Sequence, residues 1–86
     1  MIYFSVYDNL SGVYGLPVLF HNVSEAERWF SALVNNPDSN NLVHSNPGEF
    51  SLYKLGTFDE RTGVLTQDYQ KINNATSYLR PMEKGE

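Results

Sequence analysis

Cysteine is absent from the 86-residue sequence. This absence excludes a disulfide scaffold, thiolate metal ligands and a cysteine nucleophile. Small secreted domains usually depend on disulfides, so a reducing cytoplasm is the simpler location. The N-terminus lacks the basic and long apolar segments of a signal peptide. No apolar run approaches the roughly 20 residues that cross a bilayer, and we therefore expect no membrane contact.

Positive charge is also scarce. Six Lys and Arg residues stand against ten Asp and Glu residues, which gives a net charge of −4. Proteins that bind duplex DNA by neutralising many phosphates are usually basic, so this balance argues against that class but leaves room for a local basic patch. A chain this short buries a small core and is only marginally stable, so a second copy would help, and we expect a homodimer.

Aromatic residues, in contrast, are abundant at 14% of the chain, with six Tyr, five Phe and one Trp. Alternation of β-branched and aromatic residues predicts strands, and turn residues separate them. The predicted strands are 2–7, 16–20, 50–58 and 64–66. Gly63 is expected to supply a positive φ in the last hairpin, and Gly56 marks a bulge or a close backbone approach.

One amphipathic helix is predicted over residues 25–35. Ser24 and Glu27 have the spacing of a capping box, and Asn35-Asn36-Pro37 ends the helix. Apolar residues recur at i, i+3, i+4, i+7 and i+8, which makes one apolar stripe. The stripe consists of Ala26, Trp29, Phe30, Leu33 and Val34.

The order β-β-α-β-β predicts an α+β fold, in which a small antiparallel sheet of about four strands packs one face against the helix. We expect a single domain over 1–66 and a polar, partly ordered C-terminal tail over 67–86, frayed from Pro81 onward. One helix covers only one sheet face. The other face would expose Tyr3, Tyr7 and Tyr53, and an exposed aromatic face usually has a partner.

Catalytic patterns are missing from the sequence. His21 and His44 stand alone without a metal-ligand spacing, and the adjacent Asp59 and Glu60 belong to a hairpin loop. No phosphate-binding glycine loop and no G-x-S-x-G elbow occur. We therefore expect no enzyme activity, no metal and no cofactor.

Single-stranded DNA is the better chemical hypothesis, because its binders combine aromatic stacking platforms with a positively charged groove. Charge along the second half would come from Lys54, Arg61 and Lys71. The residues we assign to DNA are Tyr3, Tyr7 and Tyr53 for stacking and Lys54, Arg61 and Arg28 for phosphates. Two alternatives remain open for the tyrosines, namely a dimer interface or packing under the C-terminal tail. Arg28 has its own alternative, an i,i+3 pair with Glu25.

Several segments together resemble a known family, the small nonstructural protein of gokushoviruses, which are single-stranded DNA phages of the Microviridae. The resemblance spans residues 3–65, and its most specific part is the run L-Y-x-L-G-x-F-D-E-x-T-G. The segments that carry it are Val6-Tyr7-Asp8, Ser24-Glu25-Ala26-Glu27-Arg28-Trp29-Phe30, Leu33-Val34-Asn35-Asn36-Pro37-Asp38-Ser39, Pro47 to Glu60, and Thr62-Gly63. The family pattern H-P-x-D-F differs here, since Asn46 stands before Pro47 and His44 is displaced.

The resemblance implies a non-enzymatic phage accessory protein in the cytoplasm of the bacterial host. It implies a role in single-stranded DNA replication or packaging, and DNA binding would be the mechanism. It supplies no catalytic residues. The alternative function is a dimeric interaction module that contacts host replication proteins or phage capsid proteins.

Overall fold

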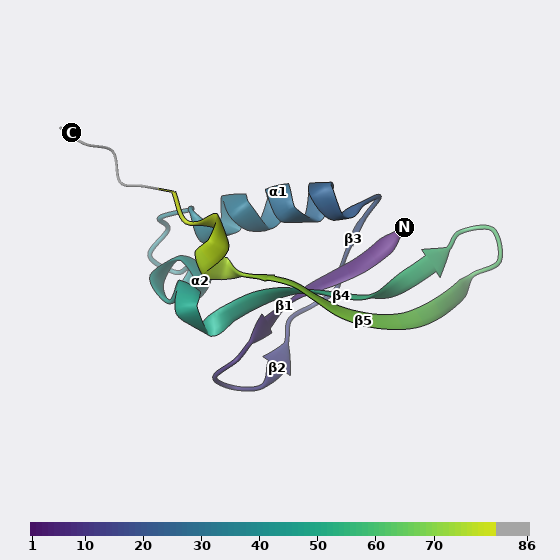
Figure 1. The fold of residues 1–86 in the computed structure, drawn as a ribbon, viewed down its shortest axis with the longest axis horizontal. Coiled ribbons are helices and arrows are strands. Elements are labelled where there is room, and N and C mark those ends of the chain that lie inside the picture. The colour runs from purple at the N-terminus through teal and green to yellow at the C-terminus, as the bar shows by residue number, and fades with distance from the viewer. Residues whose placement is uncertain (81–86) are drawn as a thin grey trace.

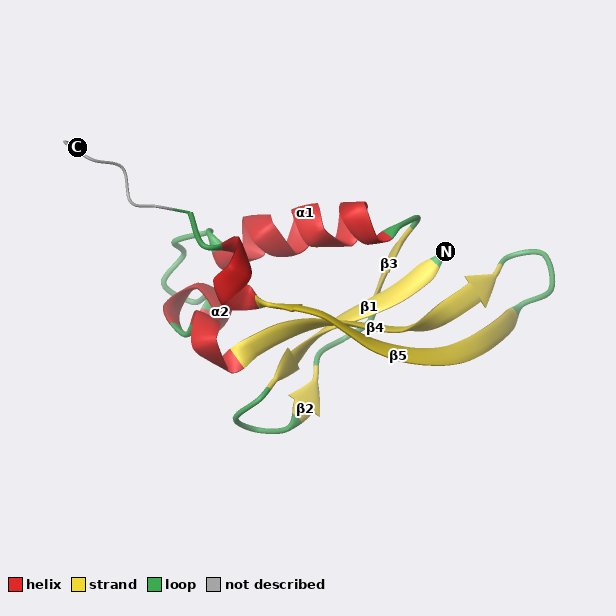
Figure 2. Cartoon of the chain, viewed as in Figure 1, coloured by secondary structure: helices red, strands yellow, loops and turns green. Residues whose placement is uncertain are grey.

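A single antiparallel sheet organises the chain (Figures 1 and 2). The computed structural model describes residues 1–80. The strand order is β2-β1-β4-β5, and β3 pairs with β1 along the same edge as β2. The strands are β1 (Ile2–Asp8), β2 (Val13–Tyr14), β3 (Val18–Phe20), β4 (Phe50–Asp59) and β5 (Val64–Asn74). The helices are α1 (Val23–Val34), α2 (Leu42–Ser45) and the 3₁₀ turns η1 (Pro47–Glu49) and η2 (Ala75–Tyr78). The predicted α+β class is confirmed.

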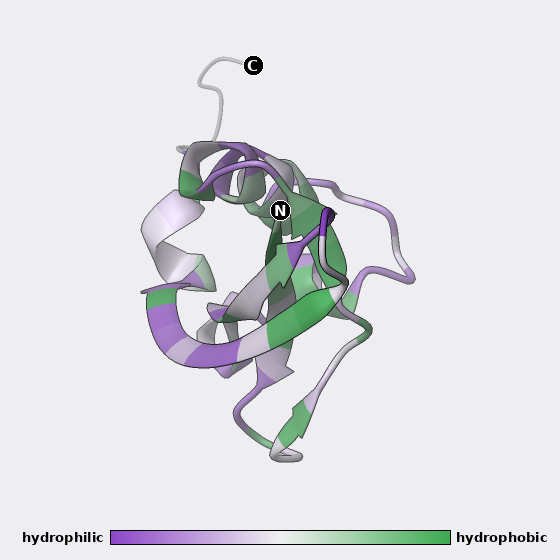
Figure 3. Ribbon diagram, turned by 90° about the vertical axis from the view of Figure 1, so that its right-hand side faces the viewer, coloured by the Kyte–Doolittle hydropathy of each residue, from purple (hydrophilic) through white to green (hydrophobic). Residues whose placement is uncertain are grey.

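The core lies between α1 and one face of the sheet. Phe4 and Leu52 from the central strands β1 and β4 are fully buried against Phe30 and Val34 of α1. Trp29 and Leu33 pack around them, so the predicted apolar stripe is the buried face of the helix. Hydrophobic colours accordingly concentrate on the strands at the centre of the molecule in Figure 3.

Helix α1 begins two residues earlier than the sequence predicts. Asn22, not Ser24, is the N-cap, and its side-chain oxygen accepts from the Glu25 backbone N–H at 2.9 Å. The Glu25 carboxylate in turn accepts from the His21 backbone N–H at 2.9 Å. This N–H is the main cause that lowers the pKa of Glu25, against some desolvation, and the charges of His21 and Arg28 add to the shift. The pair Asn22 and Glu25 therefore does what the capping box of Ser24 and Glu27 was expected to do.

The segment after α1, predicted as a loop with a turn at Pro47, folds into α2 and η1. Its polar side chains cap the C-terminal carbonyls of α1. Asn41 donates to the Leu33 carbonyl at 2.7 Å, and His44 Nδ1 lies 2.9 Å from the Val34 carbonyl. These bonds satisfy acceptors that every helix end leaves unpaired, which gives His44 a structural role.

The second predicted strand, 16–20, is shorter and is joined by an unexpected neighbour. Pro17 precedes β3, as its missing N–H requires, and β2 pairs with β1 ahead of it. Between them, the Gly15 carbonyl accepts from the Ser5 hydroxyl at 2.8 Å. The short stretch 15–17 thus interrupts what would otherwise be one strand, and the sheet has five strands.

The C-terminal part is more ordered than the sequence predicts. The strand expected to end at 66 continues to Asn74, so residues 67–74 belong to the sheet rather than to a tail. After it, Tyr78 packs edge-on against Phe30 at 5.5 Å and donates to Glu27 at 2.7 Å. Burial and the Glu27 carboxylate raise the pKa of Tyr78. The expected fraying from Pro81 lies outside the described residues.

Two glycines have the roles that the sequence predicts. Gly63 closes the β4–β5 hairpin at a φ of 77°. Gly56 lies at a register shift, where an added Cβ would stand 2.2 Å from the Thr66 carbonyl oxygen. No side chain fits there without movement of the backbone.

Candidate nucleic-acid interface

The sheet face opposite α1, here called the open face, is set by strand alternation. Phe4 and Leu52 point into the core, so their neighbours point the other way. The pairings of Ser5 with Tyr53 and of Tyr53 with Lys71 extend this face across three strands. The segment after β5 turns toward α1 through Tyr78, so the described C-terminal residues do not cover the open face.

Four tyrosines, here called the tyrosine cluster, meet on the open face. They are Tyr7, Tyr14, Tyr53 and Tyr69. The ring centroid of Tyr7 lies 4.5 Å from the ring centroid of Tyr14 and 5.4 Å from that of Tyr53. Tyr14 also lies 5.6 Å from Tyr53 and stacks at 12° to Tyr69, with centroids 6.3 Å apart. These spacings are typical of attractive aromatic pairs.

The cluster has a lower and an upper layer. Tyr14 and Tyr69 come from β2 and β5, the two outer strands, so their contact requires the sheet to curl toward the open face. Tyr7 and Tyr53, from the inner strands, are half-buried beneath them. Tyr14 and Tyr69 remain 41% and 61% exposed. Desolvation, together with the neighbouring tyrosines, raises the pKa of Tyr14. The Tyr14 ring is therefore neutral at physiological pH, and both upper rings are accessible.

The sequence predicts half of this cluster, Tyr7 and Tyr53, and the structure brings these two residues together. Tyr14 and Tyr69 are not predicted, because Tyr14 lies in a strand of two residues and the sequence places Tyr69 in a tail. The alternation of Leu65, Gln67 and Tyr69 was the available signal for Tyr69.

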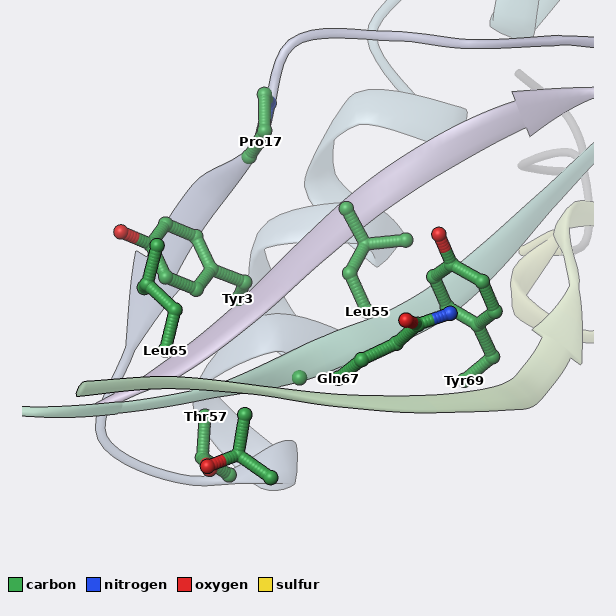
Figure 4. A pocket seen from close by; sticks show the side chains of 9 residues that line it. Tyr3, Pro17, Leu55, Thr57, Leu65, Gln67 and Tyr69 are labelled. Carbon is green, nitrogen blue, oxygen red and sulfur yellow. The ribbon is translucent and has the colours of Figure 1, made fainter.

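Tyr3, the third predicted stacking residue, lies apart from the cluster. Its ring packs edge-on against Phe58 at 6.3 Å and borders an open hollow of about 470 Å³. Figure 4 shows Tyr3, Leu65 and Tyr69 on the same side of the strands. The residues that line the hollow are Tyr3, Pro17, Leu55, Gly56, Thr57, Leu65, Thr66, Gln67 and Tyr69. Tyr69 thus joins the aromatic part of the open face to an aliphatic part.

The predicted cations do not gather at the tyrosines. Lys54 pairs in register with the buried Phe4, so it belongs to the helix side, and its ammonium lies 2.8 Å from Asp68. Arg61 lies at the tip of the β4–β5 hairpin and Arg28 on the outside of α1, and both are exposed. Lys71 is the cation of residues 1–80 that the strand register places on the open face, directly opposite Tyr53.

Carboxylates are also absent from the strand positions of the open face within residues 1–80. Asp68 points to the helix side, and Asp8, at the end of β1, accepts from the backbone N–H groups of Leu10 and Ser11. Desolvation opposes but does not cancel the effect of these bonds, which lower the pKa of Asp8. The open face is thus neutral to slightly positive in a chain with a net charge of −4.

Residues 1–80 contain no group of three His, Asp or Glu side chains arranged to hold a metal ion. Across the same residues, no helix has the length and apolar character needed to cross a membrane.

Fold and site together define a small α+β protein with a helix on one sheet face and an open aromatic face on the other. The Phage ORF5 protein family model matches residues 1–78, and the chain belongs to this family. Protein ORF5 of Chlamydia phage 1 is 35% identical over an alignment of 65 positions, and the match covers 73% of this chain and 68% of that protein. No solved structure matches the chain. The resemblance to a small phage protein of the Microviridae is confirmed, and the family match reaches η2, beyond the residues 3–65 that carried the resemblance.

Proposed function

We propose that this phage protein binds single-stranded DNA through the tyrosine cluster, as a non-enzymatic accessory factor of DNA replication or packaging in the host cytoplasm. The observation that carries the proposal is the gathering of four tyrosine rings within 4.5–6.3 Å of a neighbour, on a sheet face that none of residues 1–80 covers with a helix. Base stacking on such rings contributes about 1–3 kcal/mol per base and needs no sequence code.

We assign different roles to the two layers of the tyrosine cluster. The exposed rings of Tyr14 and Tyr69 are available to unpaired bases, and Tyr7 and Tyr53 support them from below. This assignment moves the main contacts from Tyr3, Tyr7 and Tyr53 to the upper layer. Duplex bases offer no free ring face except at the ends, so the site selects single strands.

Charge supports the same site in a modest way. Lys71 lies opposite Tyr53 and is positioned to contact a phosphate next to a stacked base. One phosphate contact predicts a shallow salt dependence, about 0.7 log units in affinity per log unit of salt. Lys54, held by Asp68, is expected to contribute little.

The test is fluorescence anisotropy with a labelled single strand of about 30 nucleotides, at low and at physiological salt, with a duplex of the same sequence as the comparison. The double variant Tyr14→Ala/Tyr69→Ala is expected to lose affinity by about 30-fold or more, since two stacking contacts disappear. Leu42→Ala removes a side chain that is 64% exposed on α2 and serves as the matched control. Equal affinity of the double variant and the control would refute the assignment of the site.

The second candidate function is a protein-interaction module that contacts phage capsid or host replication proteins. The aliphatic part of the open face favours it, since Leu65, which lines the hollow beside Leu55, is 63% exposed. Exposed aliphatic groups next to aromatic rings suit a protein partner as well as a base. No anisotropy change at low salt, where electrostatic attraction is strongest, would leave this candidate as the better one.

A further inference from the structure

The edge of β5 that faces away from β4 is a candidate interface with another chain, whether or not the protein binds DNA. We propose that two copies of this chain pair their β5 strands antiparallel, around a two-fold axis at Tyr69, to form one continuous sheet. Within residues 1–80, β5 pairs with β4 alone, so the backbone N–H and C=O groups of its other edge have no strand partner.

Strand β5 lacks most of the usual protections of an edge, although its pairing with β4 contains two register shifts. It runs for 11 residues without proline or glycine, and it carries one Lys and one Asp. Natural edge strands are commonly short, or interrupted by proline, or rich in lysine, because a long free edge is a template for another strand. Residues 64–71 of β5 are all exposed. Its length and composition therefore favour pairing over protection.

The sequence of β5 fits a second copy of itself. Tyr69 is the midpoint of Val64–Asn74, so pairing centred there uses the whole strand. In an antiparallel pair around this axis, residues whose numbers sum to 138 face each other and share a sheet face. Asp68 then faces Gln70 of the second copy, and Gln67 faces Lys71 of the second copy. Each opposed pair occurs twice, and no like charges meet.

Charge balance favours the same edge. The chain has a net charge of −4, which makes two copies repel each other over most of their surface. The formal charge of β5 is zero, since Asp68 and Lys71 cancel. An edge without net charge is where two such chains approach at the lowest electrostatic cost.

Two register shifts in the β4–β5 pairing increase the twist of β5. A twisted edge pairs best near its centre, so we assign the contact chiefly to Gln67–Lys71. The two-fold axis is perpendicular to the sheet and keeps both open faces on the same side. Tyr69 of one copy then adjoins Tyr69 of the other, and the two tyrosine clusters form one longer aromatic surface.

Opposite charge changes at one residue test the pairing. Gln70→Glu places one carboxylate opposite Asp68 of the other copy in each of the two symmetric pairs, whereas Gln70→Lys places one ammonium group there in each pair. Sedimentation velocity without DNA is expected to show a dimer. Its dissociation constant should rise about fivefold in Gln70→Glu and fall about fivefold in Gln70→Lys, from two cross-strand charge pairs. The matched controls Asn40→Glu and Asn40→Lys alter the net charge equally at an exposed loop residue.

Cysteine crosslinking tests the register, and the absence of native cysteine keeps it specific. At the axis, the two Cα atoms of residue 69 stand roughly 4.5–5.5 Å apart, within the range that a disulfide bridges. Tyr69→Cys is expected to crosslink rapidly under mild oxidation. In Gln67→Cys, the two cysteines are four strand positions apart, because residue 67 faces residue 71 of the second copy. Their Cα atoms are therefore about 14 Å apart, and this variant should not crosslink.

A monomer at all concentrations would overturn the proposal, and so would equal crosslinking of the two cysteine variants. The sedimentation and crosslinking experiments contain no nucleic acid, so their outcome does not depend on DNA binding. A dimer that ignores single-stranded DNA would refute the proposed function alone, and a monomer that binds DNA would refute the pairing alone.

Discussion

Both faces of the sheet carry packed aromatic residues, but these residues are buried on the covered face and largely exposed on the open face. On the covered face, Phe4, Phe30 and Leu52 are fully buried, and their contacts stabilise the fold. On the open face, Tyr14 and Tyr69 meet at similar distances but remain largely exposed. Aromatic packing that excludes water contributes to stability, and aromatic packing that remains wet is available to a partner. The difference teaches that ring contacts alone do not separate a core from a binding surface, whereas exposure does.

The largest expected effect is on the covered face. Phe30→Ala removes a fully buried ring that contacts Trp29 and Tyr78, and we expect it to cost about 3–5 kcal/mol of unfolding free energy. Urea denaturation followed by circular dichroism measures this loss. The matched variant Tyr69→Ala on the open face should change stability by no more than about 0.5 kcal/mol. Similar losses in both variants would show that the open face is a second core.

The next largest effect is expected on the open face, at a residue without a side chain. Gly56→Ala places a Cβ 2.2 Å from the Thr66 carbonyl oxygen, which is backbone and yields only if the strands shift. We expect a loss of about 1–3 kcal/mol, the usual cost of overpacking. Gly48→Ala is the control, since nothing lies within 4 Å of its added Cβ. Thermal melting of both variants measures the contrast, and an unchanged melting temperature in Gly56→Ala would contradict the close approach.

A smaller effect is expected at the start of α1, which holds the covering helix in place. Asn22→Ala removes the acceptor of the Glu25 backbone N–H and should cost about 1 kcal/mol. For a domain of this size that corresponds to a fall of about 4–8 °C in melting temperature. Ser24→Ala, at the residue that the sequence suggested as the cap, is expected to change the melting temperature less. The reverse order would restore Ser24 as the N-cap.

The smallest effect is a pH dependence from Glu25. Its pKa in the folded state is lowered from 4.5, so the stability it contributes is complete above that value. That contribution is lost as pH falls through the folded pKa, where the carboxylate takes up a proton. Wild type should therefore exceed Glu25→Gln in stability at pH 7, and the gap should close toward pH 3. Urea midpoints of both proteins across this range provide the measurement, and a gap that stays constant would exclude the carboxylate as its origin.

Short-range patterns account for the parts of the fold that were predicted correctly. The stripe from Ala26 to Val34 and the alternation in β1 and β4 report which side of each element is apolar. The predictions were wrong for elements that consist largely of polar residues or are fixed by polar side chains, namely the strand β5 and the N-cap of α1. In β5, the exposed edge tolerates Gln, Asp and Asn, so its composition resembles that of a loop. At α1, two residue pairs have the spacing of a cap, and only their tertiary surroundings choose between Asn22 and Ser24.

The candidate site shows the same division. Alternation placed Tyr7 and Tyr53 on one face, because neighbouring strand residues point to opposite sides. The same rule puts Lys54 on the face opposite Tyr53, a consequence that the choice of Lys54 as a DNA-binding residue overlooked. Tyr14 and Tyr69 are 55 positions apart in the chain, and no local pattern connects them.

By itself, the sequence determined the class of fold, the buried stripe of the helix, the phage family and an excess of aromatic rings beyond the needs of the core. The fold class, the stripe and the aromatic excess follow from local periodicity and composition, and the family follows from the resemblance of its motifs. Neither source requires knowledge of long-range contacts. Only the tertiary structure decided that β5 is a full strand, that the sheet curls, and that four tyrosines meet while the predicted cations stay apart. Strand pairing and curl depend on backbone bonds between distant residues, and those bonds are formed only when the whole sheet is in place.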